Sequence, residues 1–240
     1  MSKIDLQGIS FDNLNLAEAA DRAYELSRSR NSAYAVTPNA LILRNSMSNN
    51  ELKTAIEEAE LVLPDGIGVL LSAKIQGRLF KERVAGIDFA AALISRLAES
   101  GGSLFLFGSA PGVAEKAAEN IEKDFEGIKI LGVNDGYTYD KSELIEKINS
   151  LSPDFLLCCL GSPKQELWML ENKAKLRVGI MAGLGGSLDV FSGNIKRAPK
   201  LMRKLGLEWL YRIIIEPQRA RELGKMFSLI FLVTFRKKKK

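Results

Sequence analysis

The stretch Phe155-Leu-Leu-Cys-Cys-Leu-Gly-Ser-Pro-Lys-Gln-Glu166 decides the fold. Its first six residues are all apolar, as expected of a β-strand that is buried on both faces. A glycine- and proline-containing turn follows, and the polar residues after it open a helical pattern. A buried strand that continues through a short turn into a helix is typical of a parallel sheet.

The same unit recurs along the chain. Short apolar runs alternate with amphipathic stretches, which predicts a parallel sheet covered by helices on both faces. The expected strands are Ser32–Val36, Leu61–Leu63, Leu104–Phe107, Lys129–Leu131, Phe155–Leu160 and Gly179–Ala182, and the expected helices include Leu14–Arg30, Glu51–Ala59, Gly86–Ser100, Val113–Phe125 and Ser142–Ser150.

The composition limits the chemistry. The 240 residues include no histidine, which excludes His-based triads and His ligands or bases within this chain. Catalysis must therefore use carboxylates, Lys, Tyr, Ser, Thr or Cys. The adjacent Cys158 and Cys159 are interpreted as buried apolar side chains in a reducing cytosol. No Asp-x-Asp pair follows a strand, so no metal and no cofactor are expected.

The net charge of +5 is unevenly distributed. Residues 196–240 hold 14 Lys and Arg against 3 Glu, whereas residues 1–195 are mildly acidic. Such a basic segment implies an anionic partner. It also contains an apolar run that is too short to span a bilayer but suits its interface. We expect membrane contact through Phe227, Leu229, Ile230, Phe231 and Leu232, and no nucleic-acid partner.

Five turns follow the expected strands, and each is rich in glycine, proline or polar residues. Ligands of open parallel sheets bind outside the carboxyl ends of the strands, so these turns should outline one crevice. The turns are Thr37-Pro-Asn39, Pro64-Asp-Gly-Ile-Gly68, Gly108-Ser-Ala-Pro-Gly112, Gly161-Ser-Pro-Lys-Gln-Glu166 and Gly183-Leu-Gly-Gly186.

Asp65 is the candidate general base, because it is an acidic side chain at the end of a strand in this crevice. Its alternative role is to cap a helix over residues 66–76, and the glycines of the motif, Gly66 and Gly68, favour the catalytic role. Thr37 and Asn39 either bind a ligand or form an ordinary turn, and the motif alone does not separate the two.

The glycine-rich turns each have two interpretations. Gly108–Gly112 suits either a phosphate or a tight turn before a helix, with equal weight. Pro163 suits the first position of a helix, and Lys164 there is unfavourable beside the helix dipole unless an anionic ligand binds. Gly183–Gly186 favours ligand approach and close packing equally.

Taken together, these turns resemble the WecG/TagA/CpsF glycosyltransferases (glycosyltransferase family 26) over about residues 5–222. The C-terminal part of the resemblance is carried by Lys196-Arg-Ala-Pro199, Gly206-Leu-Glu-Trp-Leu-Tyr-Arg212 and Glu216-Pro-Gln-Arg219. The resemblance implies a Rossmann-like α/β core over residues 1–195 and a basic helical appendage over residues 196–240.

The resemblance also implies a bacterial, inverting, metal-independent enzyme on the cytoplasmic face of the cell membrane. It would move a sugar from a UDP-sugar donor to a polyprenyl-diphosphate-linked GlcNAc acceptor. The TagA branch uses UDP-ManNAc and makes the β-1,4-linked disaccharide lipid that starts the linkage unit of wall teichoic acid. The alternatives are a ManNAc uronate or glucose donor, or a non-catalytic module that binds nucleotide-linked ligands at the membrane. A homo-oligomer is left open.

The resemblance assigns roles to individual residues. Asp65 would be the general base, and Thr37 and Asn39 would line the sugar site. Three arginines of the appendage would reach the diphosphate, although ion pairs with Glu208, Glu216 and Glu222 are the alternative. The implied substrate-binding residues are Arg83, Gly108, Ser109, Gly112, Lys164, Gln165, Glu166, Gly185, Arg212, Arg219 and Arg221.

Overall fold

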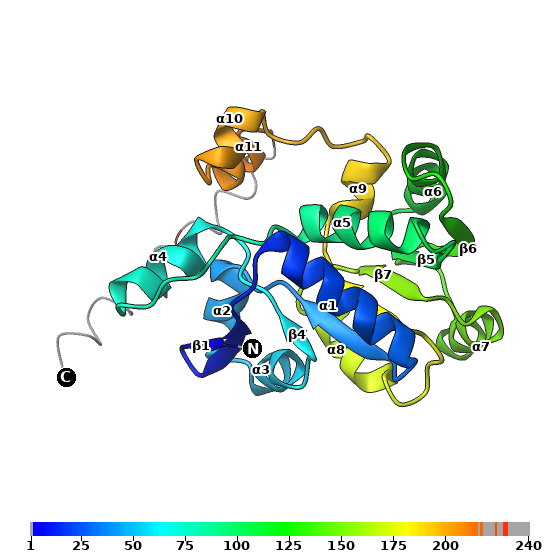
Figure 1. The fold of residues 1–240 in the computed structure, drawn as a ribbon, viewed down its shortest axis with the longest axis horizontal. Helices are drawn as coiled ribbons and strands as arrows, with labels where there is room; N and C mark the ends of the chain where they lie inside the picture. Colours follow the sequence, from blue (N-terminus) through cyan, green and yellow to red (C-terminus); the bar gives the residue numbers. More distant parts are fainter. Residues whose placement is uncertain (1, 216, 218–223, 225–227, 230–240) are drawn as a thin grey trace.

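The computed structural model describes residues 2–215, 217, 224, 228 and 229. Within them, six parallel strands form one sheet in the order β4-β3-β8-β7-β5-β6 (Figure 1). The strands are β3 (Ala33–Val36), β4 (Leu61–Val62), β5 (Ser103–Gly108), β6 (Lys129–Asn134), β7 (Phe155–Cys159) and β8 (Ile180–Gly183).

Helices cover both faces of the sheet, which confirms the predicted Rossmann-like α/β fold. Each face packs against its helices through a separate apolar cluster. One face carries α1 (Leu16–Ser29), α5 (Gly86–Ala98), α6 (Val113–Asp124) and α9 (Ser187–Phe191), and the other carries α2 (Ala40–Ser46), α3 (Asn50–Glu57), α7 (Lys141–Leu151) and α8 (Lys164–Asn172).

Strand β7 shows why its sequence is almost continuously apolar. Leu157 and Cys159 belong to the cluster on one face, whereas Leu156 and Cys158 belong to the cluster on the other. Successive side chains of a strand point to opposite faces, so both must be apolar. Burial raises the pKa of the Cys159 thiol to about 12 and that of Cys158 well above its usual value. Both cysteines are therefore packing residues, as expected.

A small hairpin was not predicted. Strands β1 (Lys3–Leu6) and β2 (Ile9–Asp12) pair antiparallel around a turn in which Gln7 and Gly8 both have positive φ. The Oδ2 atom of Asp12 accepts a hydrogen bond of 2.9 Å from the backbone N–H of Val62. This contact spans 50 residues, and it attaches the hairpin to β4.

After α9 the chain leaves the sheet layers and forms two short helices, α10 (Lys200–Lys204) and α11 (Glu208–Ile215), which we call the appendage helices (Figure 1). Gly206, between them, has φ +71°, and a Cβ at this position would lie 3.1 Å from Ile67 in α4 (Ile67–Ile75). The turn therefore requires glycine for both its conformation and its close approach to α4.

One expectation about the C-terminal segment is wrong. Leu229 is fully buried in the apolar cluster of the α2–α3 face, and the Nε of Arg44 donates to the Ser228 hydroxyl at 3.2 Å. Leu229 therefore packs in the protein rather than in a membrane. Phe227, Ile230, Phe231 and Leu232 lie outside the described residues. No helix in the described part of the chain is long and apolar enough to cross a bilayer.

Candidate active site

A cavity of about 610 Å³ opens at the carboxyl ends of four neighbouring strands, β4, β3, β8 and β7. The turns that follow these strands supply most of its walls, and α11 closes one side. Of the predicted site residues, the structure brings together six in this wall: Thr37, Asn39, Asp65, Arg83, Gln165 and Gly185.

Asp65 lies beside Thr37 and Asn39 because β3 and β4 stay paired beyond their last strand residues. The N–H of Leu63 donates to the Val36 carbonyl at 2.9 Å, and the N–H of Asp65 donates to the Pro38 carbonyl at 3.3 Å. The Asp65 side chain is half-buried in the cavity wall. It does not cap α4, which begins after Gly66 without a side-chain hydrogen bond. The capping alternative is therefore wrong.

Asn39 has a structural role in addition to lining the cavity. Its Oδ1 accepts hydrogen bonds from the N–H groups of Leu41 and Ile42, at 2.9 and 3.0 Å, and so caps α2. No described residue accepts from its Nδ2. The cap holds the amide in one orientation, with its donor side available to a ligand.

Thr37 is buried and its hydroxyl lines the cavity. A Cβ on Gly86, in the first turn of α5, would lie 3.1 Å from that hydroxyl and 3.3 Å from Leu184. The glycine thus allows α5 to begin directly against the β3 turn.

Arg83 enters the cavity from the loop before α5. The N–H of Val84 donates to the Pro64 carbonyl at 3.0 Å, which holds this loop beside Asp65. The Nη1 of Arg83 lies 3.6 Å from the Glu208 carboxylate, and its Nη2 donates to the Arg203 carbonyl at 3.4 Å. Arg83 therefore contacts both the core and the appendage helices.

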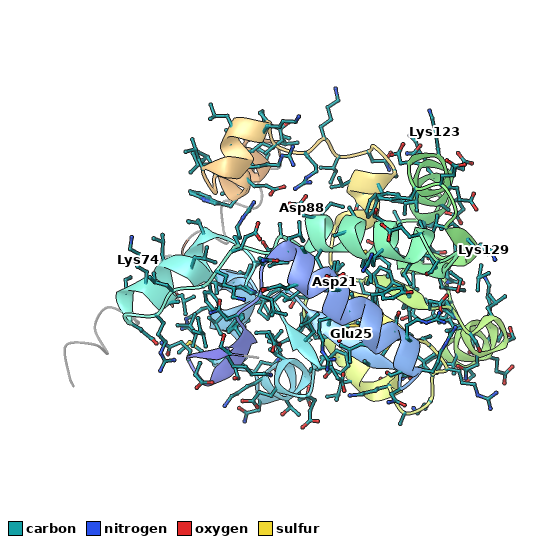
Figure 2. The ribbon with its side chains drawn as sticks, viewed as in Figure 1. Asp21, Glu25, Lys74, Asp88, Lys123 and Lys129 are labelled. Atoms are coloured by element: carbon teal, nitrogen blue, oxygen red, sulfur yellow. The ribbon has the colours of Figure 1, made fainter. Side chains whose placement is uncertain are left out.

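A second arginine continues this network. Arg197 pairs bidentately with Asp88, in the first turn of α5, at 2.5 and 3.0 Å, and its Nε lies 3.8 Å from Glu208 (Asp88 is labelled in Figure 2). Burial acts to lower the pKa of the Arg197 guanidinium, but the carboxylates of Asp88, Glu208 and Asp65 together raise it. Arg197 thus links α5 to the start of the appendage through a bidentate ion pair.

Gln165 and Glu166 form a buried hydrogen-bonded pair at the start of α8. The Nε2 of Gln165 donates to the Glu166 Oε1 at 3.0 Å, and its Oε1 accepts the N–H of Gly185 at 2.9 Å. Both side chains are almost fully buried, and only Gln165 lines the cavity. Glu166 therefore orients Gln165, and Gln165 fixes the glycine turn after β8.

Among the described helices, six begin at this cavity: α2, α4, α5, α8, α9 and α11. Asn39 caps α2, whereas the N-cap residues of α4, α5, α8 and α9 make no side-chain cap hydrogen bond. The uncapped N–H groups and the positive ends of the helix dipoles favour an anion. These helix N-termini thus favour an anionic ligand, although the charged side chains of the wall are one arginine, Arg83, and two carboxylates, Asp65 and Glu208.

Gly108 is the last residue of β5, Ser109 and Gly112 follow it, and all three lie outside the wall of this cavity. A Cβ on Gly108 would approach the Cys159 carbonyl to 2.4 Å, so close packing of β5 against β7 already requires this glycine. The Ser109 hydroxyl donates to the Asp189 Oδ2 at 3.1 Å, which ties the turn to α9.

The remaining predicted residues are placed as follows. Lys164 is exposed and does not line the cavity, and Pro163 occupies the N-cap position of α8 rather than its first helical position. Arg212 belongs to α11, but its side chain lies outside the described part, as do Arg219 and Arg221.

Four contributors were not singled out from the sequence: Glu208, Trp209, Arg197 and Asp88. Trp209 lines the cavity, and its buried indole N–H has no hydrogen-bond partner among the described residues. Two of them, Glu208 and Trp209, lie in the Gly206-Leu-Glu-Trp209 stretch quoted above. The Glu-Trp pair at the start of a helix is the sequence feature that could have identified them.

The described part of the chain contains no group of three or more His, Cys, Asp or Glu side chains that suits a metal ion. Two carboxylates, one arginine, neutral hydrogen-bonding groups and six helix N-termini instead surround the cavity. With its position at the carboxyl ends of a parallel sheet, this defines an α/β protein with a candidate ligand site in its crevice.

Comparison with known proteins identifies the family. The Glycosyl transferase WecG/TagA/CpsF family matches residues 4–240, and the chain belongs to it. A relative from Bacillus spizizenii strain W23 is 37% identical over 191 residues, which cover 80% of this chain and 74% of the relative. A relative from Staphylococcus aureus strain NCTC 8325 is 27% identical over 242 residues, covering 100% and 94%. Both relatives are named N-acetylglucosaminyldiphosphoundecaprenol N-acetyl-beta-D-mannosaminyltransferase.

The buried Glu166 predicts a pH-dependent stability. Burial raises the pKa of its carboxyl above the ordinary 4.5, against the opposing effect of the Gln165 amide. Its stabilising contribution is complete below the unfolded pKa and is lost as the pH rises through the folded pKa. Glu166→Gln keeps an acceptor for Gln165, so urea unfolding should show a stability gain over wild type that grows from about pH 4.5 upward. A difference that stays constant with pH would contradict this.

Proposed function

We propose that the chain transfers N-acetylmannosamine from UDP-ManNAc to polyprenyl-diphosphate-linked GlcNAc. The β-1,4-linked product would start the linkage unit of wall teichoic acid. The names of the relatives support the acceptor and the transferred sugar, and family membership supports the reaction type. The observation that carries the proposal is the position of Asp65 in the cavity, beside Thr37 and Asn39.

The proposed step is an inverting displacement. The C4 hydroxyl oxygen of the acceptor attacks the anomeric carbon of the donor, and the bond from that carbon to the UDP oxygen breaks. The hydroxyl proton passes to the Asp65 carboxylate, and UDP leaves with the bonding pair. Thr37 and the Nδ2 of Asn39 supply neutral hydrogen bonds that hold the transferred sugar.

The leaving UDP gains negative charge, which the protein must stabilise. The uncapped N-termini of α4, α5, α8 and α9 supply oriented dipoles around the cavity, and Arg83 supplies a cation. Such preorganised groups act where the charge develops.

The assignment of Arg212, Arg219 and Arg221 to the diphosphate remains part of the proposal. So does the division into a catalytic core over residues 1–195 and an appendage over residues 196–240.

Replacing the proposed base should abolish most of the turnover. Asp65→Asn keeps the shape but removes the proton acceptor, so we expect turnover to fall by roughly 10²–10⁴-fold with an unchanged melting temperature. The assay measures UDP release from UDP-ManNAc with a short-chain lipid-diphosphate-GlcNAc. Asp21→Asn, on the exposed surface of α1, is the matched control (Figure 2). Activity of Asp65→Asn within a few-fold of wild type would refute the role of Asp65.

Catalysis should need no divalent metal, because helix dipoles and arginine replace the metal at the leaving group. The same UDP-release assay should give equal rates with and without EDTA. Loss of activity in EDTA that Mg²⁺ or Mn²⁺ restores would show that the reaction uses a metal site.

A donor panel with UDP-ManNAc, its uronate and UDP-glucose tests the choice of sugar in the same assay.

Peripheral attachment to the inner face of the cell membrane is also proposed. Eight large apolar side chains of the described part are exposed, and seven of them lie on α4, the loop after it, the appendage helices and the turn between these helices. Exposed apolar surface can mark an interaction site, and the basic residues Lys200 and Arg203 on α10 favour anionic lipid. The seven are Leu71, Leu79, Leu201, Leu205, Leu210, Ile214 and Ile215.

Membrane attachment predicts a matched pair of variants. Leu201 and Leu205 are 69% and 60% exposed, so replacing both by Ser should leave folding intact and remove apolar area from the interface. Sedimentation with phosphatidylglycerol vesicles should show binding weakened by about tenfold or more. Tyr137→Ser, at a side chain that is 74% exposed away from these helices, should bind as wild type. Equal binding by all three proteins would contradict this membrane surface.

A further inference from the structure

A second cavity of about 500 Å³ lies next to the candidate active site and shares two wall residues with it, Arg83 and Ala85. The core supplies one side through the start of α1 and the loop before α5, and α10 supplies the other through Lys200 and Arg203. This cavity therefore exists where the appendage meets the core.

The acidic side chains of this cavity already have partners. Both carboxylate oxygens of Asp88 hold Arg197, and the Oε2 of Glu82 accepts the N–H of Leu16 at 2.8 Å. Lys200 and Arg203 differ from them, because within the described residues neither pairs with a carboxylate. Glu82 forms no ion pair within the described residues, so the unpaired side chains of the cavity are two cations and one carboxylate, and their charges sum to a net positive charge.

Arg203 is also held in place. Its Nε donates to the Ala198 carbonyl at 3.1 Å, and no residue in the described part of the chain bonds the two terminal nitrogens of the guanidinium, which can therefore face a ligand. A planar fork fixed in this way pairs bidentately with a phosphate. Lys200 stands one helical turn before it on α10 and adds a second, more mobile cation.

We propose that this second cavity binds the phosphate of a lipid-linked molecule. Its neighbours define the class of ligand: Arg83 and Ala85 connect it to the candidate active site, and the exposed Leu201 adjoins Lys200 on α10. A diphosphate here would leave its sugar beside Asp65 and its lipid beside exposed apolar side chains. The choice of the acceptor diphosphate as this ligand rests on the proposed function. An anionic phospholipid headgroup also carries a phosphate on a lipid and could bind through the same contacts.

The test compares Lys200→Ala and Arg203→Lys with Lys123→Ala, which removes one exposed charge from α6 at the far end of the molecule (Figure 2). With a soluble short-chain acceptor and no membrane, Lys200→Ala should raise the KM for the acceptor about tenfold and leave the KM for UDP-ManNAc unchanged. Arg203→Lys keeps the cation but loses the fork, so it should raise the acceptor KM by less. Melting temperatures verify folding.

Two further measurements separate the sources of the phosphate. If the acceptor KM stays unchanged but Lys200→Ala binds phosphatidylglycerol vesicles more weakly than Lys123→Ala does, the cavity binds a headgroup. Calorimetry with inorganic pyrophosphate tests the cavity even if wild type transfers no sugar, an outcome that would refute the proposed function alone. Pyrophosphate affinity, vesicle binding and acceptor KM that match those of Lys123→Ala would overturn the phosphate site.

Discussion

The pairing of β3 with β4 is the constraint on which the candidate site depends. Two hydrogen bonds beyond the strands, from Leu63 to Val36 and from Asp65 to Pro38, fix the turns side by side. A shift of one residue in this register would move Asp65 by about 3.3 Å and turn the strand's buried side chains to the other face. Because β3 also pairs with β8, the same register sets the distance from Asp65 to the Gly185 turn.

Much of this arrangement follows from local sequence. Strand β7 was predictable because both of its faces are buried, which leaves an apolar run, and the polar turns marked the carboxyl edge of the sheet. Asp65, Thr37 and Asn39 were placed together for that reason. The networks of Glu208 and Arg197 were not predictable, since the Arg83–Glu208 and Arg197–Asp88 pairs join residues more than 100 positions apart through side-chain geometry that no local pattern encodes. The packing of Leu229 was missed because an apolar run fits a membrane and a protein core equally well.

Several residues have a structural role and also line the candidate site. Their motifs therefore cannot be assigned to structure alone or to function alone. Asn39 caps α2 and also lines the cavity, and Gln165 holds the Gly185 turn while its side chain forms part of the wall. Asn39 uses only its Oδ1 in the cap, which fixes the direction of its Nδ2, whereas Gln165 bonds the protein through both its Nε2 and its Oε1. Gly108 is the opposite case, because its contact with Cys159 accounts for the glycine without any ligand.

Glu208 links the appendage to the site through charge. Its buried carboxylate lies between Arg83 of the core and Arg197. Without Glu208, Arg83 would have no carboxylate partner among the described residues, whereas Arg197 would keep its pair with Asp88. The orientation of Arg83 therefore depends on the docking of α11 against the core. Arg83 also lines both cavities. Docking of the appendage thus does two things at once: it closes the cavity around Asp65, and it forms the second cavity with Lys200 and Arg203. If the chain acts at a membrane as proposed, this coupling would make the surface that meets the lipid the same one that completes the site.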